Sequence, residues 1–403
     1  MATPLFALLV LSGAALYFMT AAERKRLAGT VLRAIHDAVR AMMHPPASAD
    51  PFNTVLRTRT RWAIVTPLLV AAHVAVFTMM LFGAGAFGDI QTSIDWGANY
   101  APRTTNNEWW RLIAATFVHA GVLHLAATIA GLLPLGLVLE RAVGRVAFAT
   151  TYVGAAVLAS IVSLWTTSAI SVSFGGSGGV FGLYGLLFAS LVSTIVRRPE
   201  VPIPLSAAKR IAAGAAPFFL YNLLTDHLST AAELVALGSG LSAGLVIARG
   251  VSREKPAMIR AVIVLAATAV IALATAVPLR GIIDVRPEIA RVAVVEERTA
   301  TAYDAAVEEF KLGRLPAKKL AQLIDRTIIP DLQGVRTRLA ALRGVPREQA
   351  PLVAAAERYL TLREQSWRRR VEGLLRANIN MLREAERTER AALDVLQTVQ
   401  PST

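Results

Sequence analysis

Residues 174–185 read Phe-Gly-Gly-Ser-Gly-Gly-Val-Phe-Gly-Leu-Tyr-Gly and place one serine, Ser177, among six glycines. Glycine permits close backbone approach and unusual conformations, so we expect this serine at an open junction between a loop and a helix. A helix that begins at Ser177 would direct its free N–H groups at whatever the hydroxyl attacks. Gly178 and Gly182 would form a small-xxx-small surface against which a neighbouring membrane helix docks. The simpler alternative is glycine-rich helix packing with an incidental serine.

The composition is that of a membrane protein. Of the 403 residues, 54% are hydrophobic and 17% charged, and the mean hydropathy is +0.50, which indicates a chain surrounded by lipid bilayer. The absence of cysteine excludes disulfides, thiolate nucleophiles and cysteine-based metal sites. The net charge of +14 would suit nucleic acid, but no basic patch interleaved with aromatic residues supports that reading. We expect no nucleic-acid partner, because arginine-rich cytoplasmic loops explain such a charge.

Eight apolar segments each approach the roughly 20 residues that a bilayer crossing requires. They are residues 4–19, 62–82, 121–139, 146–167, 177–196, 208–224, 231–248 and 258–279. When these segments alternate across the membrane, the arginines and lysines between them fall on one side, which is therefore cytoplasmic. The loop before Ser177 and everything after residue 280 then face the outside.

The chain is expected to have five parts. They are an N-terminal membrane anchor at 1–20, a basic cytoplasmic linker at 21–61, a six-helix core at 62–250, an additional span at 251–280 and a C-terminal helical domain at 281–403.

The C-terminal domain is charged and strongly helical in pattern. Pro330, Gly334 and the Gly344–Pro346 turn are expected to break it into segments, the last of which runs over residues 350–399. Apolar residues recur at helical spacing between residues 352 and 382, and this stripe suggests self-association outside the membrane. The arginine run 368–370 is interpreted as a solvated face, with contact to anionic lipid or a partner as the alternative.

Polar residues inside apolar segments are hypotheses for a functional site, because the bilayer rejects such side chains. Three segments carry them. The first holds His119, His124 and Thr128, the second holds Ser177, and the third holds Glu233. Small residues follow Glu233 at intervals of three and four, at positions 236, 240 and 244, and cut a groove on one helix face.

This ordered set resembles the rhomboid intramembrane serine proteases over about residues 62–249. Five features carry the resemblance. They are the pair Trp110-Arg111, the histidines His119 and His124, the turn with Gly136, Glu140 and Gly144, the GxSG motif at Gly175–Gly178, and the aromatic Phe181 one turn below the serine.

The resemblance implies an all-α, polytopic membrane helix bundle of rhomboid type, with a six-helix core and one extra span at each end. It implies a nucleophilic Ser177 that attacks a peptide bond of a single-span membrane protein near the outer face of the bilayer. The oxyanion would be held by the serine N–H, by His124 and by the residue at position 128. Gly175, His119 and Phe181 would surround the substrate. We expect neither a cofactor nor a metal.

Two positions depart from the family. Thr128 stands where the family has asparagine, and its hydroxyl can donate one bond with shorter reach; losing one oxyanion donor costs roughly 10²–10³ in rate. The family's basic histidine on the sixth core helix is also missing, and the alignment puts Glu233 there, or Leu237 in a shifted register.

Three residues are considered as the base. Glu233 is a weaker base than imidazole in water, and its alternative role is a buried acid paired with a polar neighbour. His227 stands six residues earlier in an outer loop, where histidines are usually solvated. His73 lies in the span before the outer loop and is expected to be a packed core residue.

Two functions from different classes therefore follow. One is a serine endopeptidase with Ser177 as nucleophile and Glu233 or His227 as an unusual base. The other is an inactive rhomboid relative that binds the transmembrane helices of client proteins without cutting them. In either case we expect a multi-pass protein of the bacterial inner membrane.

Overall fold

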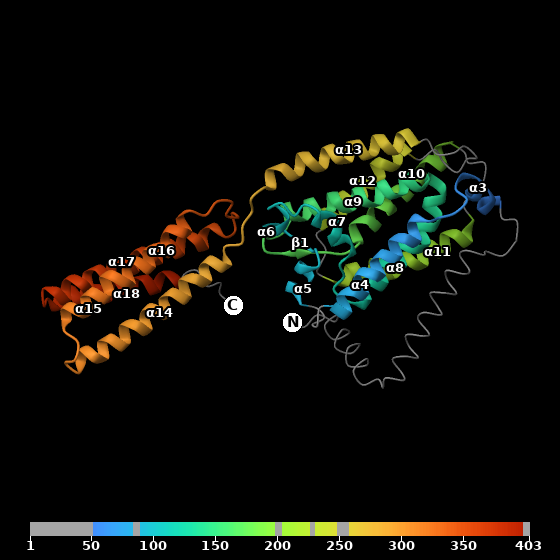
Figure 1. The fold of residues 1–403 in the computed structure, drawn as a ribbon. Coiled ribbons are helices and arrows are strands. Elements are labelled where there is room, and N and C mark those ends of the chain that lie inside the picture. Colours follow the sequence, from blue (N-terminus) through green and yellow to red (C-terminus); the bar gives the residue numbers. More distant parts are fainter. Residues whose placement is uncertain (1–50, 84–88, 198–203, 226–229, 248–257, 398–403) are drawn as a thin grey trace, which may run out of the picture. The chain divides into compact units, whose positions relative to one another are not determined.

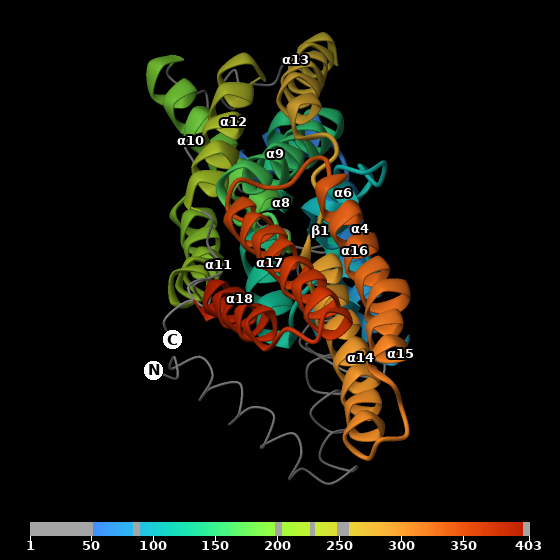
Figure 2. The same cartoon turned by 90° about the vertical axis from the view of Figure 1, so that its left-hand side faces the viewer.

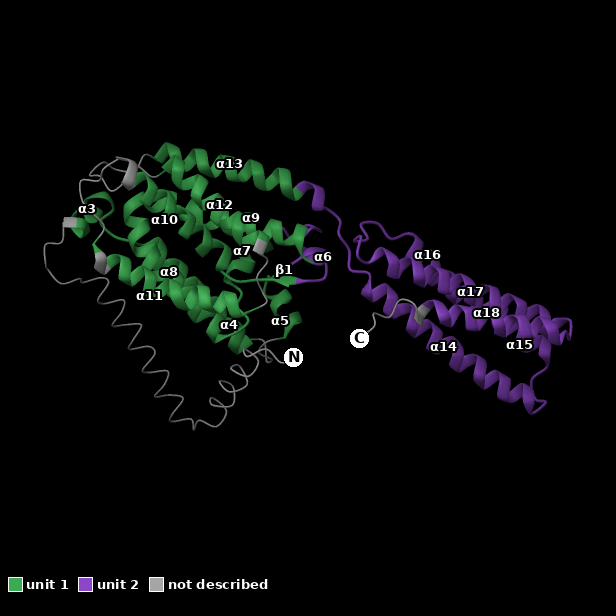
Figure 3. Cartoon of the chain, turned by 180° about the vertical axis from the view of Figure 1, so that it is seen from behind, with its two compact units in different colours: residues 1–99, 110–167, 172–276 green, residues 100–109, 168–171, 277–403 purple. Residues whose placement is uncertain are grey.

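The computed structural model describes residues 51–83, 89–197, 204–225, 230–247 and 258–397. The expected anchor at 1–20, most of the basic linker and His227 lie outside the described residues. The chain divides into two compact units (Figure 3). In the described residues, unit 1 comprises residues up to 99, 110–167 and 172–276, and unit 2 comprises residues 100–109, 168–171 and those from 277 on.

Unit 1 is a helix bundle (Figure 1). Its long helices are α4 (Val65–Gly83), α8 (Val122–Val143), α9 (Arg145–Thr166), α10 (Ser177–Arg197), α11 (Leu205–Leu224), α12 (Thr230–Ile247) and α13 (Met258–Ala276). Its short helices are α3 (Pro51–Arg59), α5 (Ile90–Asp95), α7 (Arg111–Ala114) and the 3₁₀ turn η1 (Ala115–Phe117). The strands β1 (Asn99–Tyr100) and β2 (Val172–Ser173) form a two-stranded sheet.

Each of the seven spans expected after residue 60 is a helix, and α8 begins directly after Gly121, where its N-terminus was predicted. Four of the described helical segments are long and apolar enough to cross a membrane, namely Val65–Gly83, Val122–Val143, Arg145–Thr166 and Met258–Leu279. Ser177–Ser193 and Ala231–Ile247 are shorter apolar stretches. The protein is therefore an integral membrane protein, and its membrane part is an all-α helix bundle, as expected for a rhomboid-type fold.

Glu140 joins α8 to the start of α4. Its carboxylate accepts hydrogen bonds from the N–H groups of Ile64, Val65 and Thr66 at 2.6, 2.9 and 2.8 Å, and from the Thr66 hydroxyl at 2.8 Å. The first N–H groups of a helix have no acceptor within the helix. This buried carboxylate supplies one, and it fixes the register between the two helices.

Helix α10 is packed between α9 and α12 at glycine contacts. A methyl group at Gly240 would lie 1.8 Å from the Gly182 carbonyl oxygen, and one at Gly182 would lie 2.2 Å from the Ala155 Cβ. The two backbones thus touch directly, as the small-residue spacing predicts. Because α10 and α12 approach so closely, residues at their first turns lie near each other.

The loop between α4 and α8 is held in place by Arg111. This side chain is only 2% exposed, and its Nη1 donates to the carbonyls of Ile94 and Ala98. The neighbouring Trp110 ring is exposed and lies 4.8 Å from the guanidinium carbon. The extra span α13 packs on α9, where the Trp165 indole donates to the Thr275 carbonyl at 3.0 Å.

Unit 2 is an elongated helical bundle (Figures 1 and 2). Its elements are α6 (Ala101–Thr104), the 3₁₀ turn η2 (Val277–Leu279), α14 (Arg286–Lys311), α15 (Ala317–Leu323), the π-helical turn η3 (Ile324–Ile328), α16 (Ile329–Ala340), α17 (Ala350–Leu375) and α18 (Ile379–Gln397). Its core holds Ile324, Ile328, Leu332, Leu360 and Trp367. Two loop segments, 100–109 and 168–171, also belong to it, since Tyr100 donates to Asp284 at 2.6 Å and Ser168 donates to Glu348 at 2.8 Å.

Two expectations for this domain were wrong. Gly334 lies inside α16 without breaking it, whereas Pro330 does stand where a segment begins, in the first turn of α16, where proline's missing N–H costs nothing. The last segment is two helices, because Ala377 adopts a left-handed φ of 50° and the Asn378 side chain accepts from the N–H groups of Asn380 and Met381.

The arginine run 368–370 is not simply a solvated face. Arg368 pairs with Glu364 at 2.7 Å, Arg369 bonds Thr388, and Arg370 pairs with Glu389 at 2.7 Å across the α17–α18 hairpin. Part of the apolar stripe that suggested self-association is used inside the unit, where Tyr359 and Leu360 are buried in its core. Leu375 and Ile379 of the same stripe are exposed, so self-association stays a prediction.

Candidate active site

Ser177 is the first residue of α10 and is half-buried. The chain reaches it through Gly175, which has a φ of 115° and donates its N–H to the Ala115 carbonyl at 2.8 Å. The Gly176 carbonyl accepts the first bond of the helix, from the N–H of Val180. The N–H groups of the first helical turn therefore have no acceptor within the helix, and they point beyond the N-terminal end of α10, where Ser177 lies.

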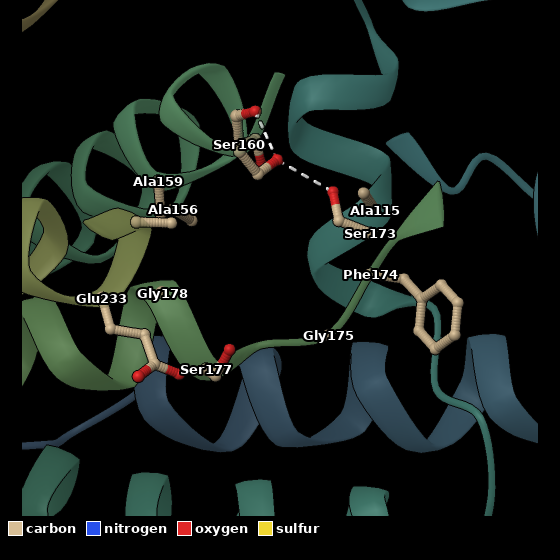
Figure 4. A pocket seen from close by; sticks show the side chains of 12 residues that line it. Ala115, Ala156, Ala159, Ser160, Ser173, Phe174, Gly175, Ser177, Gly178 and Glu233 are labelled. Atoms are coloured by element: carbon tan, nitrogen blue, oxygen red, sulfur yellow. Dashed lines mark hydrogen bonds between the residues drawn. The ribbon is translucent and has the colours of Figure 1, made fainter. Parts of the chain in front are cut away.

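Glu233 lies in the first turn of α12 and lines the same small cavity as Ser177 (Figure 4). The cavity has a volume of about 70 Å³. Figure 4 shows the carboxylate near Ser177 at the start of α10, with no hydrogen bond drawn between the two side chains. Among the described residues the structure gives Glu233 neither a hydrogen bond nor an ion pair. A half-buried carboxylate and a helix-terminal hydroxyl thus share one space.

His124 lies against the backbone just before the serine. A methyl group at Gly175 would be 2.6 Å from both Cε1 and Nε2 of the His124 ring, so only glycine fits at this position. The ring stacks on Tyr221, with centroids 5.3 Å apart and planes inclined by 16°. His119 meets His124 edge-on at 4.8 Å, and its Nδ1 lies 3.0 Å from the Phe117 carbonyl. An imidazole at this place can face an oxyanion that forms at Ser177.

Thr128 uses its hydroxyl within its own helix. The Oγ1 donates to the His124 carbonyl at 2.9 Å, and the methyl group faces Gly176, where an added Cβ would lie 2.8 Å from it. The side chain is 1% exposed. In this conformation the donor that the resemblance assigns to the oxyanion is already bound to the backbone.

Comparison with known proteins agrees with this geometry. Residues 106–250 match the family model described as Rhomboid domain. The chain carries a rhomboid domain. The matched segment contains Ser177, His124, His119, Thr128, Phe181 and Glu233. No solved structure matches the chain.

Curated relatives include proteases. The chain is 31% identical over 127 residues to Rhomboid protease GluP of Bacillus subtilis (strain 168), covering 31% of this chain and 24% of the relative. It is 24% identical over 194 residues to Rhomboid protease AarA of Providencia stuartii, covering 43% and 66%. It is 38% identical over 87 residues to RHOMBOID-like protein 5 of Arabidopsis thaliana, covering 21% and 28%. The chain thus spans less than two thirds of the length of each.

Phe181 of this rhomboid lies one turn below the serine in an aromatic cluster. Its ring centroid is 5.3 Å from that of Phe218 and 5.5 Å from that of Phe219, both on α11. It also packs against an alanine cluster of α9 and α12, formed by Ala155, Ala159, Ala232 and Ala236. The ring therefore fills the space between two helices at the floor of the site.

His73 and Tyr152 support the serine loop from beneath, and the residue pattern alone did not reveal this. His73 is fully buried, as expected, but its Nε2 lies 2.8 Å from the Tyr152 hydroxyl. A methyl group at Gly176 would lie 2.9 Å from the His73 ring and 3.2 Å from that hydroxyl. The pair therefore limits how closely the backbone immediately before Ser177 can approach α4 and α9.

A row of polar groups lines the cavity on the side away from Glu233. The Ser163 hydroxyl lies 2.9 Å from the Ser173 hydroxyl and donates to the Ser160 carbonyl at 2.9 Å (Figure 4). The Asn99 amide donates to the same carbonyl at 2.9 Å. Serines three residues apart in the apolar span of α9 were the sequence signal for this row, and the sequence analysis did not use it.

Proposed function

We propose that this rhomboid is an intramembrane serine endopeptidase, with Ser177 as nucleophile and Glu233 as its general base. The observation that supports the proposal is the shared cavity of the hydroxyl and the carboxylate, together with the absence of a described counter-charge for Glu233. An ionised carboxylate within hydrogen-bond reach of a serine can accept its proton.

The first half of the reaction forms an acyl-enzyme. The Ser177 oxygen attacks the carbonyl carbon of the scissile peptide bond while its proton passes to Glu233. The carbonyl oxygen becomes an oxyanion beside the N–H groups of the first turn of α10 and the imidazole of His124. When the intermediate collapses, the C–N bond breaks and the leaving amine takes the proton from Glu233.

The second half uses water. The cavity has room for it, since about 10–15 Å³ of such volume holds one water molecule and the cavity provides about 70 Å³. The Ser160–Ser163–Ser173 row offers the polar partners that a bound water requires. Water attacks the acyl carbon and gives a proton to Glu233, the ester bond breaks, and Ser177 recovers its proton.

We propose that the substrates are single-span membrane proteins, which are cut near the face of the membrane at which Ser177 lies. The arginine- and lysine-rich loops lie at the other ends of the spans, so we place the active site on the outer side of a bacterial cytoplasmic membrane. His227 is kept as the second candidate for the base.

The engagement of the Thr128 hydroxyl favours a second function, a client-binding rhomboid without proteolysis. With this donor bound to the His124 carbonyl, the oxyanion has one donor fewer. A fluorophosphonate probe, which reacts with activated serines, separates the two functions. A protease is labelled in the wild type and not in Ser177→Ala, whereas equal labelling of the two proteins would support the binding function.

A further inference from the structure

A second and larger cavity lies at the other end of α9. It has a volume of about 420 Å³ and is lined by the linker before α4, the α8–α9 turn and the first turn of α13. Its lining residue Arg145 and the active-site residue Ser160 stand 15 positions apart on one helix, which is about 22 Å at 1.5 Å per residue. This cavity is therefore separate from the serine site.

Arginines give this cavity a positive charge. Arg59, Arg61 and Arg145 line it. Arg145 donates to the Trp62 carbonyl through Nε at 3.2 Å and Nη2 at 2.9 Å, which engages two of the five N–H donors of its guanidinium. Within the described residues no carboxylate forms an ion pair with Arg61 or Arg145, and the nearby Glu140 is already bound to the start of α4.

Backbone N–H groups at the start of α9 would also favour an anionic group in this cavity. Gly144 caps α9 without any side-chain hydrogen bond, and Val146 and Ala147 in the first turn line the cavity. Their N–H groups have no acceptor within the helix, and the positive end of the helix dipole lies here. An anionic group would thus meet arginine side chains and backbone donors together.

The rest of the lining is apolar and partly exposed. Val146 and Met258 are 43% and 66% exposed, and Ala261 lies behind them. Trp62, next to the arginines, is 49% exposed, which is typical of a side chain at the level of lipid headgroups. An occupant that suits both the charged and the apolar part of the lining has an anionic head and an apolar tail.

We propose that this cavity binds the phosphate headgroup of one anionic phospholipid from the arginine-rich leaflet, with its acyl chains along α13. The phosphate would accept from Arg61, Arg145 and the first turn of α9. The proposal goes beyond the proposed function, since it holds whether or not the protein cuts peptide bonds.

Native mass spectrometry of the full-length protein in neutral detergent tests it. Phosphatidylglycerol and phosphatidylcholine are titrated separately. We expect one retained phosphatidylglycerol, and an affinity at least about tenfold weaker in the double variant Arg61→Gln/Arg145→Gln, because two charge-assisted contacts are lost. Met258→Glu, which leaves the arginines in place, should also weaken binding through repulsion.

The matched control is Lys209→Gln/Arg210→Gln, which removes two exposed charges from α11, away from the cavity. It should bind phosphatidylglycerol as the wild type does. Equal retention of phosphatidylcholine, or equal weakening in the control, would overturn the proposal. Displacement of the lipid by inorganic phosphate at equal concentration would show a small-anion site and would also overturn it.

Discussion

Glu233 in unit 1 and Glu296 in unit 2 are carboxylates among packed helices, but their surroundings differ. In unit 2 the buried guanidinium of Arg363 binds both Glu296, at 3.0 Å, and Glu389. The guanidinium carbon of Arg363 also lies over the Trp367 ring, 5.1 Å from its centroid. Glu233 has no such partner among the described residues.

The difference separates structural charge from functional charge. Removing a carboxylate from water costs several kcal/mol unless it is paired, so the paired acids of unit 2 are explained by the fold alone. Glu140 of unit 1 is explained in the same way by its four hydrogen bonds. A half-buried acid that lacks these partners and lies beside a serine is a candidate for chemistry.

Of the substitutions that test this comparison, Arg363→Met is expected to change stability most. It leaves two carboxylates without their shared counter-charge and should destabilise unit 2 by about 3–5 kcal/mol. Hydrogen exchange of α17 peptides in the full-length protein measures the change. Arg298→Met is the control, because its ion pair with Asp331 is exposed and worth less than about 1 kcal/mol. Equal effects of the two substitutions would contradict the account of unit 2.

A smaller effect is expected from Gly240→Ala in unit 1. The added methyl group would meet the Gly182 carbonyl and push α10 from α12, at a cost of about 1–3 kcal/mol. Gly238→Ala on the same helix has nothing within 4 Å of its new methyl group and should be neutral or slightly stabilising. Hydrogen exchange in α10 and α12 reports both. A silent Gly240→Ala would show that the helices do not touch here.

The smallest effect is expected at Asp284. Burial alone would raise the pKa of this carboxyl, but hydrogen bonds from Arg286 and Tyr100 outweigh burial and hold the pKa below its usual range. A lowered folded-state pKa stabilises the fold above the unfolded value of about 3.9, and this stability is lost as the pH falls through the folded value.

Asp284→Asn should therefore be less stable than the wild type at pH 7, and the gap should narrow by pH 3. Melting temperatures of the two proteins at both pH values test this. A gap that stays constant with pH would show that Asp284 does not stabilise through its charge.

The helices of unit 1 were predictable because local pattern decides them. Apolar length located the spans, and the glycines at 178, 182 and 240 predicted which helices touch. That contact, with the register of α12, was enough to expect Glu233 beside Ser177. The His73–Tyr152 pair was not predictable, because its partners are 79 residues apart and neither carries a local signal.

The errors in unit 2 have a similar origin. The hairpin between α17 and α18 depends on Asn378 as a helix cap, a signal that was present but outweighed by the continuous helical pattern around it. The arginine run resembled a solvated face because the partners of Arg369 and Arg370, Thr388 and Glu389, come from the other arm of that hairpin. Pairing across a turn cannot be predicted when the turn itself is missed.

The most direct test of the Ser177–Glu233 pair is cleavage of a transmembrane substrate in liposomes by three proteins that differ only at position 233. Wild type should be active. Glu233→Gln keeps the shape but cannot accept a proton, so its rate should fall by about 10²-fold or more. Glu233→His should restore activity, because imidazole accepts and returns a proton near neutral pH. Activity of Glu233→Gln equal to that of the wild type would contradict the assignment of Glu233 as the base.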